Sequence, residues 1–153
     1  MKLGGNKNNN FMDLALDLAK QAALIDEVPV GAVVVLDGRV IASAHNEVYS
    51  KSDPTAHAEL LAIQRAARHL STPYLNNCDI YVTLEPCPMC AHALSIAKIR
   101  RLYFGALDPK GGGVESGPRI YHSASCHHTP EVYSEIKAEE SSLLLRGFFM
   151  TKR

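Results

Sequence analysis

The sequence of 153 residues predicts an α/β fold. Short runs rich in β-branched residues alternate with segments whose apolar residues recur at helical spacing. Strands that alternate with helices are typical of a sheet covered by helices on both faces. The hydrophobic fraction of 46% and the charged fraction of 21% are those of a globular protein with one sizeable core. We therefore expect a single domain over residues 11–153, preceded by a flexible, Gly/Asn/Lys-rich leader over residues 1–10.

The first half of the chain predicts a helix, a β-hairpin and a second helix. Residues 11–26 carry apolar side chains at helical spacing, which indicates an amphipathic helix. Residues 31–36 and 39–44 are expected as strands, and Asp37-Gly38 between them is a strong two-residue hairpin signal. A second helix is expected from about Thr55 to Leu70.

The second half predicts three more strands and two more helices. In order, they are a strand over 79–84, a helix over 87–99, strands over 101–106 and 131–136, and a helix over 138–150. Pro86 stands where a helix can begin, because its missing N–H costs nothing in a first turn. Residues 108–118 include Gly111-Gly112-Gly113 but lack the spacing of a nucleotide-binding loop, so we expect a flexible loop there.

Composition excludes several classes of protein. The formal net charge is zero, which argues against a strongly basic nucleic-acid binder. No stretch approaches the ~20 apolar residues that a membrane helix needs, so no membrane association is expected. Two of the four cysteines stand in a C-x-x-C pair, and a chain of this size with much aliphatic core needs no disulfide framework. A reducing, cytoplasmic location is the prediction, since metal-bound cysteines must be thiolates.

One constellation carries chemistry: His57, Cys87 and Cys90 are zinc-type ligands, and Glu59 is a free carboxylate. Three protein ligands leave a fourth position for water, which indicates a catalytic Zn²⁺ site. Both motifs stand at predicted helix starts, where the helix dipole favours thiolates. Glu59 could accept the proton of the water and redeliver it to the substrate. These parts suit hydrolysis at a carbon that bears an amine, but amide hydrolysis would use similar parts.

Simpler interpretations stay open at this point. The two cysteines could be core residues with a chance spacing, and Glu59 could merely complement a helix dipole. A structural zinc site would need a fourth ligand, which Cys126, His127 or His128 could supply.

The H-x-E and P-C-x-x-C pair is typical of zinc deaminases that act on nucleobases. From about Val28 to Asp108, over half of its length, the chain resembles the bacterial tRNA-specific adenosine deaminases of the cytidine deaminase superfamily. The resemblance rests on VPVGAV (28–33), HN (45–46), DPTAHAE (53–59), YVTLEPC (81–87), Met89-Cys90 and FGA (104–106).

The resemblance implies a three-layer α/β/α sandwich around a five-stranded mixed sheet, a homodimer and one zinc ion per subunit. It implies conversion of the wobble adenosine of a tRNA anticodon to inosine, with attack at C6 of a flipped-out adenine and proton transfer by Glu59. It also implies that Asn46 contacts the base or ribose and that Asp108 lies near the nucleotide backbone. Alternatively, Asn46 simply ends a strand and Asp108 opens a turn.

Two other functions compete with this one. The chain could deaminate a free base or nucleoside such as cytosine, cytidine or guanine, and its zero net charge mildly favours that substrate over tRNA. It could also be a non-catalytic RNA-binding or zinc-stabilised module, but the open fourth ligand position and Glu59 argue against this. The YVTLEPC context and Asp108 favour the tRNA substrate.

Overall fold

A five-stranded mixed sheet forms the centre of the computed structural model, which describes the backbone of residues 2–152 and the side chains of residues 10–152. The strands are β1 (Gly31–Leu36), β2 (Arg39–His45), β3 (Asp79–Leu84), β4 (Arg101–Ala106) and β5 (Glu131–Tyr133). They lie in the order β2-β1-β3-β4-β5. The strand β1 is antiparallel to β2 and β3, whereas β3, β4 and β5 run parallel to one another. The predicted mixed sheet is confirmed.

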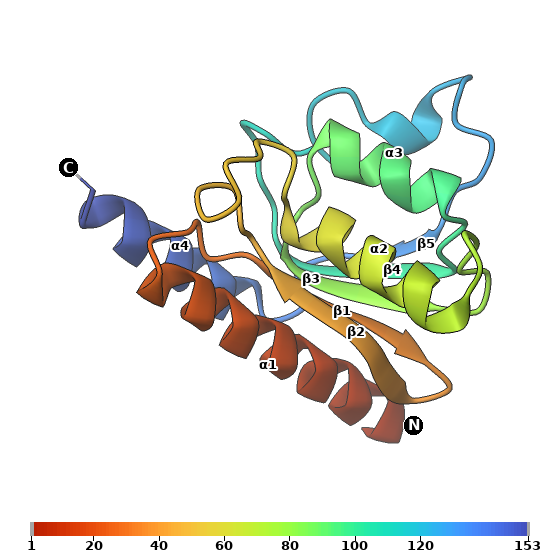
Figure 1. Ribbon diagram of the computed structural model, residues 1–153, viewed down its shortest axis with the longest axis horizontal. Helices are drawn as coiled ribbons and strands as arrows, with labels where there is room; N and C mark the ends of the chain where they lie inside the picture. The colour runs from red at the N-terminus through yellow and green to blue at the C-terminus, as the bar shows by residue number, and fades with distance from the viewer. Residues whose placement is uncertain (1, 153) are drawn as a thin grey trace.

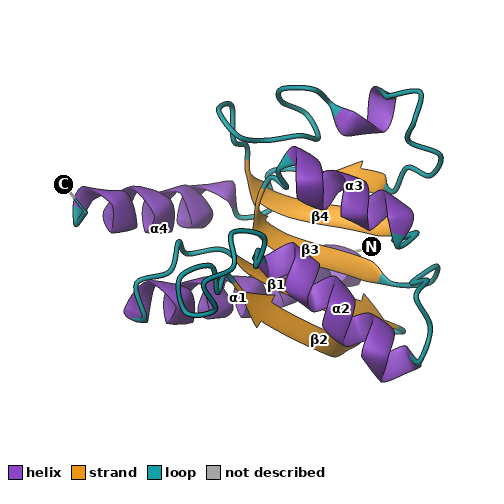
Figure 2. Cartoon of the chain, turned by 45° about the horizontal axis from the view of Figure 1, so that its top comes forward, coloured by secondary structure: helices purple, strands orange, loops and turns teal. Residues whose placement is uncertain are grey.

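Helices cover both faces of this sheet (Figure 1). The helices α2 (Ala58–Leu70) and α3 (Pro88–Ile96) lie on one face, and α1 (Lys2–Leu24) and α4 (Ala138–Met150) on the other (Figures 1 and 2). One apolar cluster fills the space beneath α2 and α3, and a second lies between the sheet and α1. The predicted three-layer α/β/α sandwich is therefore confirmed. None of the helices in the described part of the chain is long and apolar enough to cross a membrane.

The β-hairpin at residues 36–39 forms as predicted. Asp37 and Gly38 have φ angles of 51° and 77°, and positive φ at both positions is the geometry of a two-residue hairpin turn. The first strand of this hairpin, β1, packs directly against α1. A Cβ atom at Gly31 would lie 2.0 Å from the carbonyl oxygen of Ala15, so only glycine permits this approach.

Several element boundaries differ from the prediction. The helix α1 begins at Lys2 rather than at residue 11, because residues 2–10 contain no proline and continue the helix although Gly and Asn are weak helix formers. The flexibility predicted for residues 1–10 stays a prediction. The helix α2 begins at Ala58 rather than Thr55, since Asp53 accepts hydrogen bonds from both the N–H and the hydroxyl of Thr55 in a turn. Smaller shifts occur at the ends of other elements: α1 stops at Leu24, β2 at His45, α3 at Ile96 and β5 at Tyr133.

The topology brings four chain segments to one edge of the sheet. The parallel strands β3 and β4 end there, at Leu84 and Ala106, and α2 and α3 both begin there. The crevice outside the carboxyl ends of parallel strands is where α/β folds bind ligands. Each predicted site residue stands in one of the loops or helix starts at this edge.

Candidate active site and metal centre

The first residues of two helices place three ligand atoms together. His57 is the N-cap of α2 and Cys87 the N-cap of α3, both with extended backbone, and Cys90 lies in the first turn of α3. The Nδ1 atom of His57 lies 3.6 Å from Sγ of Cys87 and 3.5 Å from Sγ of Cys90. Tetrahedral zinc with ordinary Zn–N and Zn–S bonds would hold such atoms about 3.5 Å apart. The spacing of these three donors therefore fits a zinc ion.

The electrostatics of this cluster favour thiolate character. The Cys90 thiol hydrogen-bonds the sulfur of Cys87, and together with His57 it lowers the pKa of Cys87 to about 4 although burial opposes the shift. The hydrogen bond to Cys87 in turn raises the pKa of His57. A sulfur atom that is ionised at neutral pH is the form that binds a metal cation.

Glu59 lies beside the three ligands but does not belong to their cluster. Among the described residues, the cluster of possible metal ligands comprises His57, Cys87 and Cys90 alone. The Glu59 side chain is 4% exposed, and its burial raises the pKa of this carboxyl to about 7. A carboxyl group with a pKa near neutrality can both accept and donate a proton under physiological conditions.

Asn46 is 8% exposed and lies next to the first residue of α2. Its Oδ1 atom accepts a hydrogen bond of 2.8 Å from the backbone N–H of Ala58, which is one of the unsatisfied donors in the first turn of α2. The amide therefore has a structural partner, and it also lines the same cavity as His57 and Glu59. The contact of Asn46 with a base or ribose stays a prediction.

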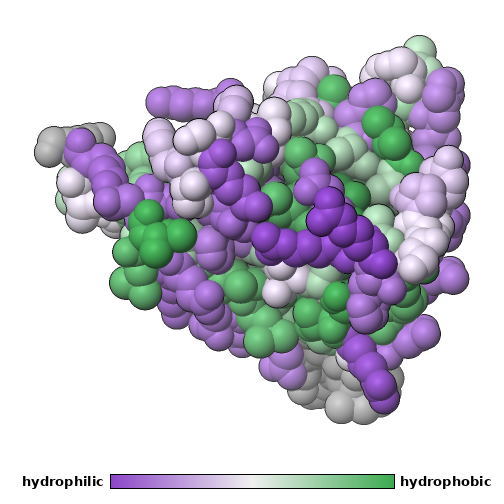
Figure 3. Space-filling model, viewed as in Figure 1, coloured by the Kyte–Doolittle hydropathy of each residue, from purple (hydrophilic) through white to green (hydrophobic). Residues whose placement is uncertain are grey.

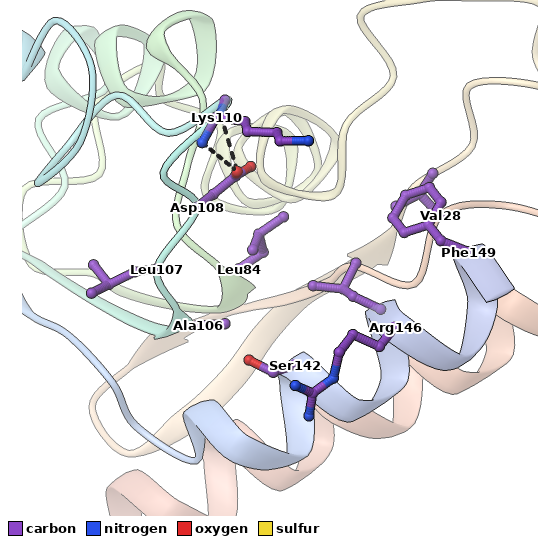
Figure 4. A pocket seen from close by; sticks show the side chains of 11 residues that line it. Val28, Leu84, Ala106, Leu107, Asp108, Lys110, Ser142, Arg146 and Phe149 are labelled. Carbon is purple, nitrogen blue, oxygen red and sulfur yellow. Dashed lines mark hydrogen bonds between the residues drawn. The ribbon is translucent and has the colours of Figure 1, made fainter.

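A cavity of about 310 Å³ extends from the ligand cluster to the surface, and Asp108 forms part of its wall. A second cavity of about 570 Å³ adjoins it, because Val28, Leu84 and Asp108 line both. Figure 4 shows this second cavity, with Asp108 and Lys110 facing Arg146 and Phe149 of α4. The Oδ1 atom of Asp108 accepts N–H groups of Lys110 and Gly111, drawn as dashed lines. The turn predicted at Asp108 is thus present and stands at the junction of both cavities.

The residues proposed as a fourth zinc ligand lie elsewhere. The Sγ atom of Cys126 is 3.1 Å from the hydroxyl of Ser95, and Nε2 of His128 contacts the carbonyl of Ile99 at 2.7 Å. His127 does not join the ligand cluster either. The described residues therefore leave the fourth ligand position open, which is the arrangement of a catalytic zinc site.

Two buried carboxylates near the site were missed by the sequence analysis. Glu27, which is 1% exposed, accepts the backbone N–H groups of Tyr49 and Ser50 and so fixes a loop at the cavity rim. Glu85 binds the segment that contains Asp108. Glu85 could have been suspected, because it directly precedes the P-C-x-x-C motif, whereas Glu27 carries no signal in the sequence.

Comparison with known proteins agrees with this geometry. The family model of the cytidine and deoxycytidylate deaminase zinc-binding region matches residues 5–106. A tRNA-specific adenosine deaminase of Agrobacterium fabrum is 54% identical, over 96% of this chain and 97% of its own length. One from Rickettsia typhi is 46% identical, over 93% of this chain and 97% of its own length. A solved structure from work on A-to-I editing by tRNA:A34 deaminases has a TM-score of 0.88 at 54% identity, covering 89% of this chain and 99% of that chain.

The fold and the His/Cys/Cys site define a zinc-dependent deaminase, and the chain belongs to the cytidine and deoxycytidylate deaminase family. Within that family it belongs with the tRNA-specific adenosine deaminases, which confirms the predicted resemblance.

Proposed function

We propose that this protein hydrolyses the wobble adenosine of a tRNA anticodon to inosine, with release of ammonia. The observation that carries the proposal is a buried carboxyl group, Glu59, which lines the same cavity as the zinc-type ligands His57 and Cys87. In support, relatives that match nearly the whole length of the chain are named tRNA-specific adenosine deaminases.

The residues of the site divide the chemistry between them. His57, Cys87 and Cys90 would hold the zinc ion, which would supply Lewis acidity and make water a better nucleophile at neutral pH. Glu59 accepts one proton from the attacking water and passes it to the adenine ring; it then accepts the second proton, from the hydroxyl group now on C6, and passes it to the amino group, which leaves as ammonia. Asn46 and Asp108, which both line this cavity, bind the nucleotide.

An extended substrate suits the surroundings of the site better than a free base does. A cavity of about 310 Å³ has room for one nucleoside, and the adjoining cavity of about 570 Å³ offers space for neighbouring nucleotides. Lys110 and Arg146 line that second cavity and can neutralise phosphate groups there (Figure 4). Although the net charge of the chain is zero, these two cations provide local positive charge for binding tRNA.

A three-way substrate assay tests the function. The purified protein is incubated with tRNA of its own organism, with free adenosine, and with cytidine and guanine, and ammonia and inosine are measured. We expect release of ammonia from tRNA only, with one inosine formed at the wobble position of the substrate tRNA. Activity on free bases or nucleosides with none on tRNA would instead favour the free-base deaminase.

We also propose a homodimer located in the cytoplasm. Large apolar side chains are exposed at Leu24, Ile25, Ile96 and Leu143. Figure 3 shows an apolar patch at the place where Figure 1 draws the C-terminal end of α1. Exposed apolar patches are typical of surfaces that associate. The four cysteines, all within the described residues, are free thiols, which is in keeping with a reducing compartment.

Sedimentation equilibrium checks the oligomeric state. At micromolar concentration we expect a species of twice the mass of one chain, unchanged by a reducing agent because no disulfide holds it. A monomer at these concentrations, with full activity on tRNA, would contradict the dimer and leave the catalytic proposal intact.

A further inference from the structure

The buried carboxylate of Glu85 gathers one loop onto the end of β3. Glu85 is 2% exposed, and among the described residues all the hydrogen bonds that its side chain accepts come from residues 108–116. The Oε1 atom accepts the N–H of Asp108 at 2.9 Å and the hydroxyl of Ser116 at 2.8 Å. The Oε2 atom accepts the N–H groups of Val114 at 3.1 Å, Glu115 at 2.8 Å and Ser116 at 2.9 Å. A buried carboxylate satisfied in this way holds its donors firmly.

The run of three glycines makes this arrangement possible. A Cβ atom at Gly112 would lie 2.4 Å from Cδ of Glu85, and one at Gly113 would lie 2.6 Å from Cα of Pro88. The N–H of Gly112 also bonds the carbonyl of Asp108, and that of Gly113 bonds the carbonyl of Pro86. The segment predicted as a flexible loop is therefore packed against Glu85 and against the start of α3 without room for side chains.

This packing sets the wall between the two cavities. Asp108 and Gly111 line both cavities, and they lie in the segment that Glu85 binds. Glu85 itself is next to the metal-ligand motif but is not one of the clustered ligand atoms. Its carboxylate thus links the end of β3 to the segment around Asp108 that separates the two cavities.

We propose that Glu85 is a positioning residue, which holds the Gly-rich segment 108–116 as a fixed wall and thereby places Asp108 against the RNA substrate. The proposal rests on the proposed function for its substrate, but the anchoring of the segment stands on the contacts of Glu85 alone. Misplacement of a binding group by about 1 Å can cost up to about 100-fold in catalytic efficiency. Because Asp108 binds rather than transfers protons, the loss is expected mainly in KM.

The variant Glu85→Gln tests this role. In either orientation the NH₂ group of the new amide faces backbone N–H donors, so the hydrogen bonds accepted by one of the two carboxylate oxygens are lost. We expect zinc content to stay at one per chain, KM for tRNA to rise about tenfold with a smaller change in kcat, and amide hydrogen exchange of residues 108–116 to accelerate.

The matched control is Asp79→Asn, at the opposite end of the same strand. Asp79 is also largely buried and forms two hydrogen bonds with Arg100, of 2.9 and 3.0 Å, and it lines neither of the two cavities. This change is expected to lower thermal stability but to leave KM, zinc content and the exchange of residues 108–116 unchanged.

A glycine pair gives a second test that does not alter Glu85. Gly112→Ala places a methyl group where the Glu85 carboxyl lies, whereas a Cβ atom at Gly147 in α4 meets nothing within 4 Å. Gly112→Ala should reproduce the rise in KM and the faster exchange, and Gly147→Ala should show neither.

Unchanged exchange and unchanged KM in folded Glu85→Gln or Gly112→Ala would overturn the proposal, and so would loss of zinc, which would place the effect at Cys87. If the protein did not act on tRNA at all, the proposed function would fail, while hydrogen exchange would still decide whether Glu85 anchors the segment.

Discussion

Glu59→Ala is expected to abolish turnover while the protein keeps its fold and its zinc. The carboxyl group is buried beside the ligand cluster, and its pKa of about 7 allows it to act as base and then as acid. Proton transfer by a positioned side chain contributes about 10²–10⁴-fold to rate, so kcat on tRNA should fall by about 10³-fold or more. Inosine formation in a tRNA assay, together with metal analysis of the same sample, measures both quantities.

Glu59→Gln and Glu140→Gln complete this experiment. Glu59→Gln keeps the size of the side chain and should be as inactive as the alanine variant, because an amide is neither a general base nor a general acid at neutral pH. Glu140, in the exposed first turn of α4, provides a control carboxylate whose replacement should leave kcat unchanged. Full activity of Glu59→Ala with stoichiometric zinc would remove Glu59 from the mechanism.

The parts of the fold that depend on local interactions could be predicted from the sequence. The Asp37-Gly38 turn needs only its own two residues, and it forms as expected. The zinc-type ligands stand at helix starts, as predicted from the H-x-E and P-C-x-x-C motifs, although α3 begins at Pro88 and the predicted first-turn proline, Pro86, precedes its N-cap. The order of the strands could not be predicted in this way, because the neighbours of β1 are set by packing among segments far apart in the chain.

The Gly-rich segment shows why the remainder was missed. From its own sequence, residues 108–118 are rich in glycine and look flexible. The partner that orders them, Glu85, stands between 23 and 31 residues earlier in the chain. Glu27 is a similar case, because it stands just after the end of α1 and binds the backbone N–H groups of Tyr49 and Ser50. A buried carboxylate that binds distant backbone groups leaves no periodic pattern in a sequence.

Cys87→Ala is expected to cost the protein its zinc. Cys87 is the thiolate of the cluster, with a pKa of about 4, and its loss leaves His57 and Cys90 as the only two clustered ligands among the described residues. Two protein ligands are fewer than the three that catalytic zinc sites use. Metal analysis after dialysis against a chelator should find less than stoichiometric zinc and no formation of inosine, with the secondary structure retained by circular dichroism.

Cys126→Ala is the control that separates a catalytic site from a structural one. Cys126 contacts Ser95 and lies outside the ligand cluster, so its replacement should leave zinc and activity at wild-type levels. If Cys126→Ala lost zinc as Cys87→Ala does, the metal would have four protein ligands and no position for water. If Cys87→Ala kept one zinc per chain, Cys87 would not be a ligand. The pair of variants therefore decides whether the fourth position at this metal is free for chemistry.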